Sequence, residues 1–141
     1  MEPLNLDGLP DLALLLVDSA PIIYLLEGHA RHAARFRPLF AAHAEGKVRL
    51  AISAITMAEV LTGPLRSGNE PLARRYRQLL ETWQVVPLDA DIAESAARLR
   101  ASLKLKLPDA VQAASALAIG ADALVTHDRD FARMSSLRVL K

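Results

Sequence analysis

The sequence predicts an α/β fold in which helices cover both faces of a parallel β-sheet. Short apolar segments alternate along the chain with longer segments of helical pattern, as in strand–helix–strand units. The first apolar segment, LALLLV at 12–17, has no polar position, as expected for a strand that is buried on both faces. The chain has 141 residues, 52% of them hydrophobic, which suits one domain with a substantial core.

The first strand is expected at 12–17 and is followed by a helix. Ser19 is the expected N-cap of that helix, Pro21 lies in its first turn, and Gly28 ends it. A second helix is expected over 31–45.

The next strand is expected at 48–52, with Ser53 as the cap of a helix over 54–62. The pair Gly63-Pro64 should stop that helix. A further helix is expected over 71–82.

The second half of the chain continues the alternation and ends on two short strands. The expected elements are a strand at 84–88, a helix that begins at Asp89 or Asp91 and runs to 103, a helix over 108–119, and strands at 123–126 and 137–140.

The amino-acid composition excludes several kinds of functional site. Without cysteine, the chain has no disulfide, no thiolate zinc site and no cysteine nucleophile, which fits a cytoplasmic protein. The apolar run 12–17 is too short to cross a bilayer, and residues 1–11 lack the Lys or Arg of a signal peptide, so no membrane association is expected.

The net charge of +1 hides an uneven distribution. Residues 1–30 hold five acidic residues and no Lys or Arg, whereas residues 31–141 hold all 17 Lys and Arg against 11 acidic residues. This excess permits a polyanionic partner, although solvated helix faces explain the same charges.

Acidic residues fall where a parallel sheet would gather them. Asp18 directly follows the first strand, Asp128 and Asp130 follow the fourth, Asp109 opens a helix, and Glu59 lies in the helix that leaves the second strand. Ligands of such sheets bind at the carboxyl ends of the strands. These side chains are therefore expected to border one crevice.

Each acidic residue alone has a structural explanation. Asp18 fits a helix cap, Asp109 gains about 0.3–1 kcal/mol from a helix dipole, Glu59 fits a solvated face, and Asp128 with Asp130 fits an Asx-turn. Together they suggest a site that needs a counter-charge, because carboxylates about 5 Å apart repel by ~3 kcal/mol at an effective dielectric near 20. Mg²⁺ or Mn²⁺ would offset this repulsion and would suit phosphodiester hydrolysis.

The histidines are weaker signals. His29, His32 and His43 are expected at the surface, and His127 is expected to be an exposed turn residue beside the acidic crevice, with contact to a phosphate or nucleobase as the alternative. The sequence has no Ser/His/Asp elbow, no phosphate-binding glycine loop and no dinucleotide fingerprint.

Four segments resemble a known family. LLLVDSAPIIYLLEG at 14–28, LAISAITMAEVLTGP at 50–64, the long segment at 105–131 that ends in THDRDF, and the final strand LRVLK at 137–141 resemble PIN domains, specifically the VapC-type toxin ribonucleases. The resemblance covers residues 12–141 as a single PIN domain, preceded by an N-terminal extension at 1–11. It implies a three-layer α/β/α sandwich with strand order 3-2-1-4-5.

The resemblance also implies roles for the acidic residues. Asp18, Glu59, Asp109 and Asp128 match the four acids of the metal pocket, and Asp130 matches a more variable auxiliary acid. Of the two aspartates in THDRDF, Asp128 is the expected member of the ligand shell, whereas Asp130 is expected to shape the turn, cap the short helix or hold an arginine.

Two hydroxyl residues match positions beside that pocket, namely Ser19 and Thr126. The basic residues that precede Asp109 are candidate phosphate contacts: Arg98, Arg100, Lys104 and Lys106.

The resemblance thus implies the toxin of a type II toxin–antitoxin pair, an Mg²⁺- or Mn²⁺-dependent endoribonuclease that leaves a 5′-phosphate and a 3′-hydroxyl. Its expected partners are RNA, a VapB-like antitoxin and a second copy of itself in a homodimer, with the alanine-rich stretch 110–118 serving either dimer or core packing. One alternative is a non-catalytic PIN-like module that binds RNA or protein. Another is a receiver-like phosphoacceptor, which needs a lysine after a late strand; after residue 106 only Lys141 is available.

Overall fold

Five parallel strands form one sheet in the computed structural model, which describes residues 2–141 except the side chains of residues 132 and 133. The predicted extension is therefore described from Glu2 onward, because Met1 lies outside the described residues. The order β3-β2-β1-β4-β5 confirms the prediction and differs from the receiver-like order 2-1-3-4-5. The strands are β1 Ala13–Val17, β2 Val48–Ser53, β3 Gln84–Val86, β4 Ala123–Val125 and β5 Val139–Leu140.

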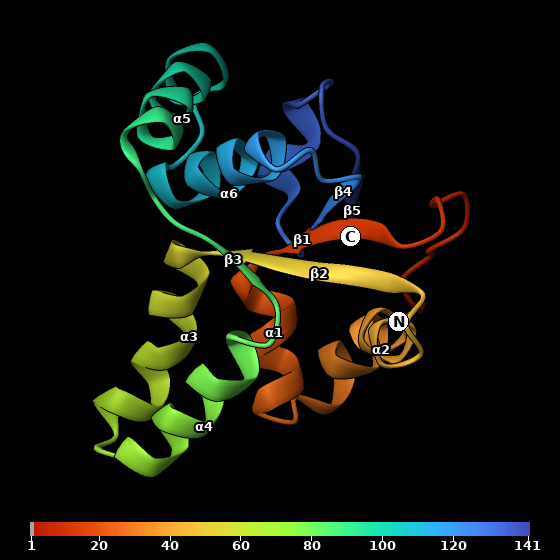
Figure 1. Ribbon diagram of the computed structural model, residues 1–141, viewed down its shortest axis with the longest axis vertical. Coiled ribbons are helices and arrows are strands. Elements are labelled where there is room, and N and C mark those ends of the chain that lie inside the picture. Colours follow the sequence, from red (N-terminus) through yellow and green to blue (C-terminus); the bar gives the residue numbers. More distant parts are fainter. Residues whose placement is uncertain (1) are drawn as a thin grey trace.

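Helices cover both faces of this sheet and complete a three-layer sandwich. Figure 1 shows α1 to α4 on one face and α5 with α6 on the other. The bounds are α1 Ser19–Leu26, α2 Ala30–Ala44, α3 Ala54–Arg66, α4 Glu70–Leu80, α5 Ala90–Leu103, α6 Leu107–Ala118 and the 3₁₀ helix η1 Arg129–Arg133.

Alternate side chains of β1 supply two separate cores. Leu15 and Val17 pack with Phe36 of α2 on one face, and Leu16 packs with Val111 of α6 on the other. All five are essentially inaccessible to solvent, and burying each contributes about 1.5–3 kcal/mol. Because β1 is apolar on both faces, it lies at the centre of the sheet, and its carboxyl end lies beside those of β2 and β4.

The prediction that Gly63-Pro64 stops the third helix is wrong. Helix α3 continues through both residues to Arg66, and the chain turns at Gly68, whose φ is +72°. A proline inside a helix costs about 3 kcal/mol, but Pro64 is buried, and its carbonyl accepts a hydrogen bond from Asn69 N at 2.8 Å. Tertiary packing therefore overrides the local stop signal.

The structure also decides which residue caps α1 and where the alanine-rich stretch of α6 packs. Asp18, not Ser19, is the N-cap of α1, since its side chain accepts a hydrogen bond from Ser19 N. The alanine-rich stretch of α6 lies in the core, where Ala110, Ala113 and Ala114 are buried.

The ends of the described chain also join the fold. Leu4 is buried in the core, and its backbone N–H donates to the carbonyl of Arg35 at 2.8 Å. No helix within residues 2–141 combines the length and apolar character needed to cross a membrane.

Candidate active site

An acidic hollow of about 560 Å³ opens at the carboxyl ends of β1 and β4. All four acids that the sequence singled out contribute to it, although they come from four separate segments. Its lining includes Asp18, Glu59, Asp109 and Asp128, together with Ser19, Tyr24, His127 and Arg129.

Asp18 forms the floor of this hollow and is 8% exposed. It directly follows the central strand, so its carboxylate is held by the surrounding backbone and side chains. Oδ1 accepts from Ser19 N at 2.8 Å and from Gln112 Nε2 at 3.1 Å, and Oδ2 accepts from Thr126 Oγ1 at 2.8 Å. Burial raises the pKa of Asp18, and the charge of Asp128 raises it further, while the three hydrogen bonds oppose the rise.

Gln112 connects Asp18 to the start of α3, and sequence analysis missed it. Its Nε2 also donates to Thr56 Oγ1 at 2.5 Å, and its Oε1 accepts from Ser53 Oγ at 2.7 Å. The amide is 1% exposed, so it is fully committed to these partners. The available signal was a single amide within the otherwise small and apolar stretch 110–118.

Thr126 orients two acids at once. Its hydroxyl donates to Asp18 and accepts from the backbone N–H of Asp128 at 2.9 Å. The prediction that Thr126 lies beside the acids is therefore matched by the geometry. The side chain is completely buried, which fixes the spacing between the end of β1 and the turn after β4.

Replacing Thr126 with valine is expected to lower the free energy of unfolding by about 1–3 kcal/mol, because it leaves a buried carboxylate oxygen and an amide N–H without a partner. The variant should also raise the pKa of Asp18 above its wild-type value, since one opposing hydrogen bond is lost. Urea unfolding at neutral pH measures the first effect. Thr126→Ser keeps the hydroxyl and is the matched control; equal losses in both variants would contradict this role.

Glu59 reaches the hollow from α3 and is exposed. Partial loss of solvent raises its pKa, and the negative charge of Asp18 adds to the rise. A hydrogen bond with the Ser19 side chain opposes it. Glu59 is thus a carboxylate at the solvent side of the site, with Ser19 beside it as predicted.

Asp109 is the most perturbed of the acids. It lies in the first turn of α6, and desolvation followed by the charges of Asp128, Asp18 and Asp130 raises its pKa to about 6. Lys106 opposes this rise. The Oδ2 atom of Asp109 is buried and has no hydrogen-bond partner.

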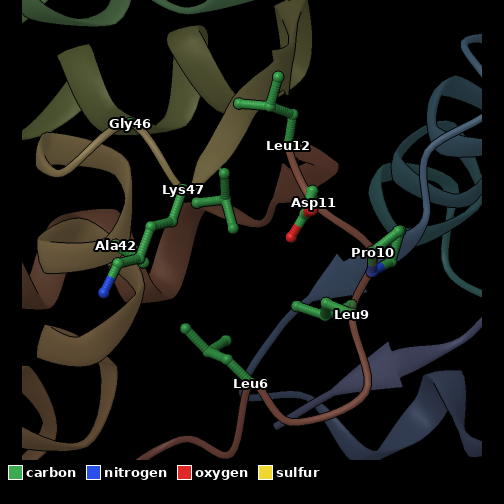
Figure 2. A pocket seen from close by; sticks show the side chains of 9 residues that line it. Leu6, Leu9, Pro10, Asp11, Leu12, Ala42, Gly46 and Lys47 are labelled. Carbon is green, nitrogen blue, oxygen red and sulfur yellow. The ribbon is translucent and has the colours of Figure 1, made fainter.

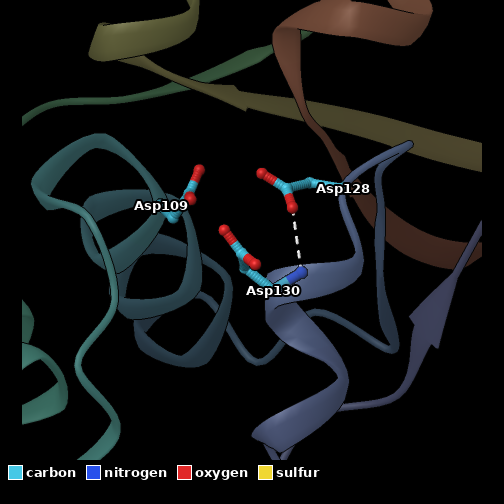
Figure 3. A group of neighbouring side chains, drawn as sticks. All are labelled: Asp109, Asp128 and Asp130. Atoms are coloured by element: carbon cyan, nitrogen blue, oxygen red, sulfur yellow. Dashed lines mark hydrogen bonds between the residues drawn. The ribbon is translucent and has the colours of Figure 1, made fainter.

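Asp109, Asp128 and Asp130 form a compact group in which one carboxylate oxygen of each lies within 4.8 Å of the others. Figure 3 shows the three side chains converging between the start of α6 and η1. Asp128 Oδ1 accepts from Asp130 N at 2.8 Å and caps η1, so that Asp130 lies in the first turn of η1 and, of its three expected roles, does not serve as the cap of this helix. Asp130 instead turns its carboxylate toward the other two.

These residues fit a hard divalent cation. A buried carboxylate oxygen without a donor is costly, and three carboxylates at this spacing repel one another. Oxygen-only ligands are those preferred by Mg²⁺ and Mn²⁺. Asp109, Asp128 and Asp130 would hold such an ion, with Asp18 at the floor of the same hollow.

His127 is not the exposed turn residue that the sequence suggested. Its Nδ1 lies 2.9 Å from the hydroxyl of Tyr24, and its ring lies edge-on to Phe36 at a centroid distance of 5.8 Å. The ring of His32 lies 4.8 Å away, so the predicted surface position of His32 is also only partly correct. His29 is exposed and His43 is half-buried, both on the α2 side of the sheet.

A family model described as PIN domain matches residues 15–137. The chain belongs to the PIN domain family. This confirms the resemblance carried by the four sequence segments. No curated protein matches this PIN domain in sequence.

Solved structures show the same architecture. A chain of a toxin–antitoxin complex from Klebsiella pneumoniae is 32% identical, with a TM-score of 0.69 over 87% of this chain and 94% of that one. A chain of VapBC-1 from nontypeable Haemophilus influenzae is 25% identical, with a TM-score of 0.69 over 89% and 96%. At 22% identity, VapC20 of Mycobacterium tuberculosis, described as a Sarcin-Ricin loop cleaving toxin, shares the fold, with a TM-score of 0.66 over 88% and 98%.

The four predicted phosphate contacts lie at different distances from the acids of the PIN domain. Lys106 directly precedes α6 and acts on Asp109 electrostatically. Arg98 pairs with Glu94 and lines a separate hollow between α5 and α6. Arg100 and Lys104 lie at the end of α5, where Arg100 Nε donates to the carbonyl of Leu105 at 3.3 Å.

Another hollow, of about 460 Å³, lies at the opposite edge of the sheet, at the amino ends of β1 and β2. Figure 2 shows its mostly apolar lining, contributed by residues 6–12 and by the turn at Gly46 and Lys47. It contains one acid, Asp11, and one base, Lys47, and so lacks the charge cluster of the acidic hollow.

Proposed function

We propose that the protein is an Mg²⁺- or Mn²⁺-dependent endoribonuclease and the toxin of a type II toxin–antitoxin pair. The observation that carries the proposal is Asp109, whose buried Oδ2 has no hydrogen-bond partner and whose carboxylate lies in a group with those of Asp128 and Asp130, within a PIN domain. The repulsion within such an acidic group destabilises the folded state unless the group binds a cation.

The acidic residues would then have distinct roles in this site. Asp109 and Asp128 would hold the ion with Asp130 as the auxiliary ligand, and a bound divalent cation would supply charge neutralisation of a phosphate and a lowered pKa for an attacking water. Asp18 would position the site through Thr126 and Gln112.

Glu59 is the candidate proton acceptor. Desolvation and the charge of Asp18 raise its pKa, which makes the carboxylate a stronger base than a free glutamate. It lines the hollow at the solvent side, where an attacking water would enter. In-line attack at phosphorus would leave a 5′-phosphate and a 3′-hydroxyl.

The proposed partners rest on the family and on one of the similar solved structures. The Klebsiella pneumoniae chain, 32% identical, belongs to a toxin–antitoxin complex, which supports a VapB-like antitoxin for this protein. The basic excess after residue 30 supports an RNA substrate. We further propose a cytoplasmic homodimer, organised as a single PIN domain at 12–141 after an extension at 1–11.

A non-catalytic binding module is the weaker candidate. A surface that binds RNA without metal gains nothing from carboxylates that repel both one another and the phosphates. The group formed by Asp109, Asp128 and Asp130 suits a cation rather than an anion.

Cleavage of RNA in the presence of Mg²⁺ is expected for the wild type and should cease with a chelator. Asp18→Asn and Asp128→Asn should each reduce the rate by more than about 100-fold, because the first removes the carboxylate that positions the site and the second removes a ligand of the ion. Asp130→Asn should lose less, since Asp130 is exposed. Asp91→Asn, in the first turn of α5, is the control and should retain wild-type rates; wild-type rates in the Asp18 and Asp128 variants would refute the assignment.

A further inference from the structure

A basic hollow of about 300 Å³ adjoins the acidic one. Its lining is Arg35, His127, Arg129 and Lys141, with no acidic side chain among them. His127 and Arg129 line both hollows, so they form the wall between them. A ligand that enters the acidic hollow can therefore contact both.

The cations of this hollow are not neutralised by carboxylate side chains. Arg35 donates to the backbone oxygens of Glu2 and Lys141, which fixes its guanidinium without the use of any carboxylate side chain. The ion pairs found among the described side chains join other residues: Lys47 with Glu45, Arg77 with Glu81, and Arg98 with Glu94. Cationic side chains that line a hollow without a carboxylate side chain among them are suited to an anion.

His127 is held in place by contacts on its inner side. The Tyr24 hydroxyl engages Nδ1, and the rings of Phe36 and His32 pack against the imidazole. Nε2 is the ring nitrogen that remains for a ligand. A fixed imidazole between the two hollows costs little entropy when it binds.

The acidic site creates a need for such cations. Five carboxylates belong to Asp18, Glu59, Asp109, Asp128 and Asp130, and one divalent ion offsets only part of their charge. A polyanionic strand would still be repelled unless nearby cations bind phosphates that are not being cleaved.

We propose that Arg35, His127, Arg129 and Lys141 bind a backbone phosphate of the RNA strand next to the phosphate that lies in the acidic hollow. The identity of the ligand as RNA rests on the proposed function. The subsite would fix the register of the strand and contribute binding rather than bond cleavage.

The test is RNA binding without turnover, measured with labelled single-stranded RNA in a chelator over about 50–200 mM salt. Arg129→Gln and Lys141→Gln should each weaken binding, by up to about tenfold, and reduce the slope of log affinity against log salt by about 0.7. Arg74→Gln removes an exposed arginine of α4 and should leave the slope near that of wild type. Wild-type slopes in both the Arg129 and Lys141 variants would overturn the subsite.

Cleavage assays separate this result from the proposed function. With Mg²⁺, Arg129→Gln should raise KM and leave kcat close to wild type, which is the signature of lost binding. Asp128→Asn should do the reverse, binding RNA at least as well as wild type while cleaving poorly. If the wild type binds RNA with the predicted slopes but never cleaves it, the nuclease assignment fails and the subsite stands.

Discussion

Replacing Asp109 with asparagine is expected to inactivate the protein and stabilise it at the same time. The folded state raises the pKa of this carboxyl from 3.8 to about 6, mainly through desolvation. Between those two values the folded protein binds more protons than the unfolded chain, so stability falls as pH rises, and above pH 6 the full cost of the charge is present. Asparagine cannot ionise, so the variant avoids this loss of stability.

The gain at pH 8 should be about 1–2 kcal/mol, discounted for the solvent that reaches this half-buried group, and should vanish near pH 4. Cleavage should fall by more than about 100-fold. Urea unfolding in a chelator at both pH values measures the stability. Added Mg²⁺ should stabilise the wild type and not the variant, because only the wild type binds the ion tightly.

Asp91→Asn is a matched control, since Asp91 also lies in the first turn of a helix. Both variants lose the same favourable interaction with a helix dipole, about 0.3–1 kcal/mol, but only Asp109 lies within the acidic group. A variant at Asp109 that is less stable than wild type at pH 8 would show that its charge is favourable in the fold and would refute the cluster argument.

Local sequence patterns predicted the order of elements and the four converging acids. The apolar strand β1 and the helix caps at Ser53 and Asp89 can be predicted from the sequence, because each depends only on residues close by in the chain. A carboxylate that follows a strand must lie at its carboxyl end, so Asp18 and Asp128 could be placed once the sheet was parallel.

Features set by contacts between distant segments could not be predicted. Pro64 remains in a helix because it is buried, His127 is withdrawn from solvent by Tyr24, and Asp130 turns toward Asp109 of a different element. None of these contacts has a signature within a few residues. The same holds for Gln112, whose partners lie 56 to 94 residues away in sequence.

Gln112→Leu is expected to cause the largest loss of stability of any substitution proposed for this protein. Leucine fills a similar volume but provides no polar atom, so Ser53 and Thr56 lose a partner and Asp18 loses one of its donors. Each buried polar group left unsatisfied costs about 1–3 kcal/mol, which gives a total of about 3–5 kcal/mol. Urea unfolding at neutral pH, with unchanged slope against denaturant, would measure it.

Ser115→Ala is the matched control on the same face of α6. Ser115 is 1% exposed, and its hydroxyl has no hydrogen-bond partner, so its removal should change stability by less than about 0.5 kcal/mol or increase it. If Gln112→Leu fails to fold, Gln112→Glu keeps the shape and places an acid against Asp18. Its pKa would be raised by burial and by that charge, so its stability should recover as pH falls and the acid is protonated. A pH-independent deficit in Gln112→Glu, or a loss in Gln112→Leu no greater than in Ser115→Ala, would show that the amide network does not hold the site together.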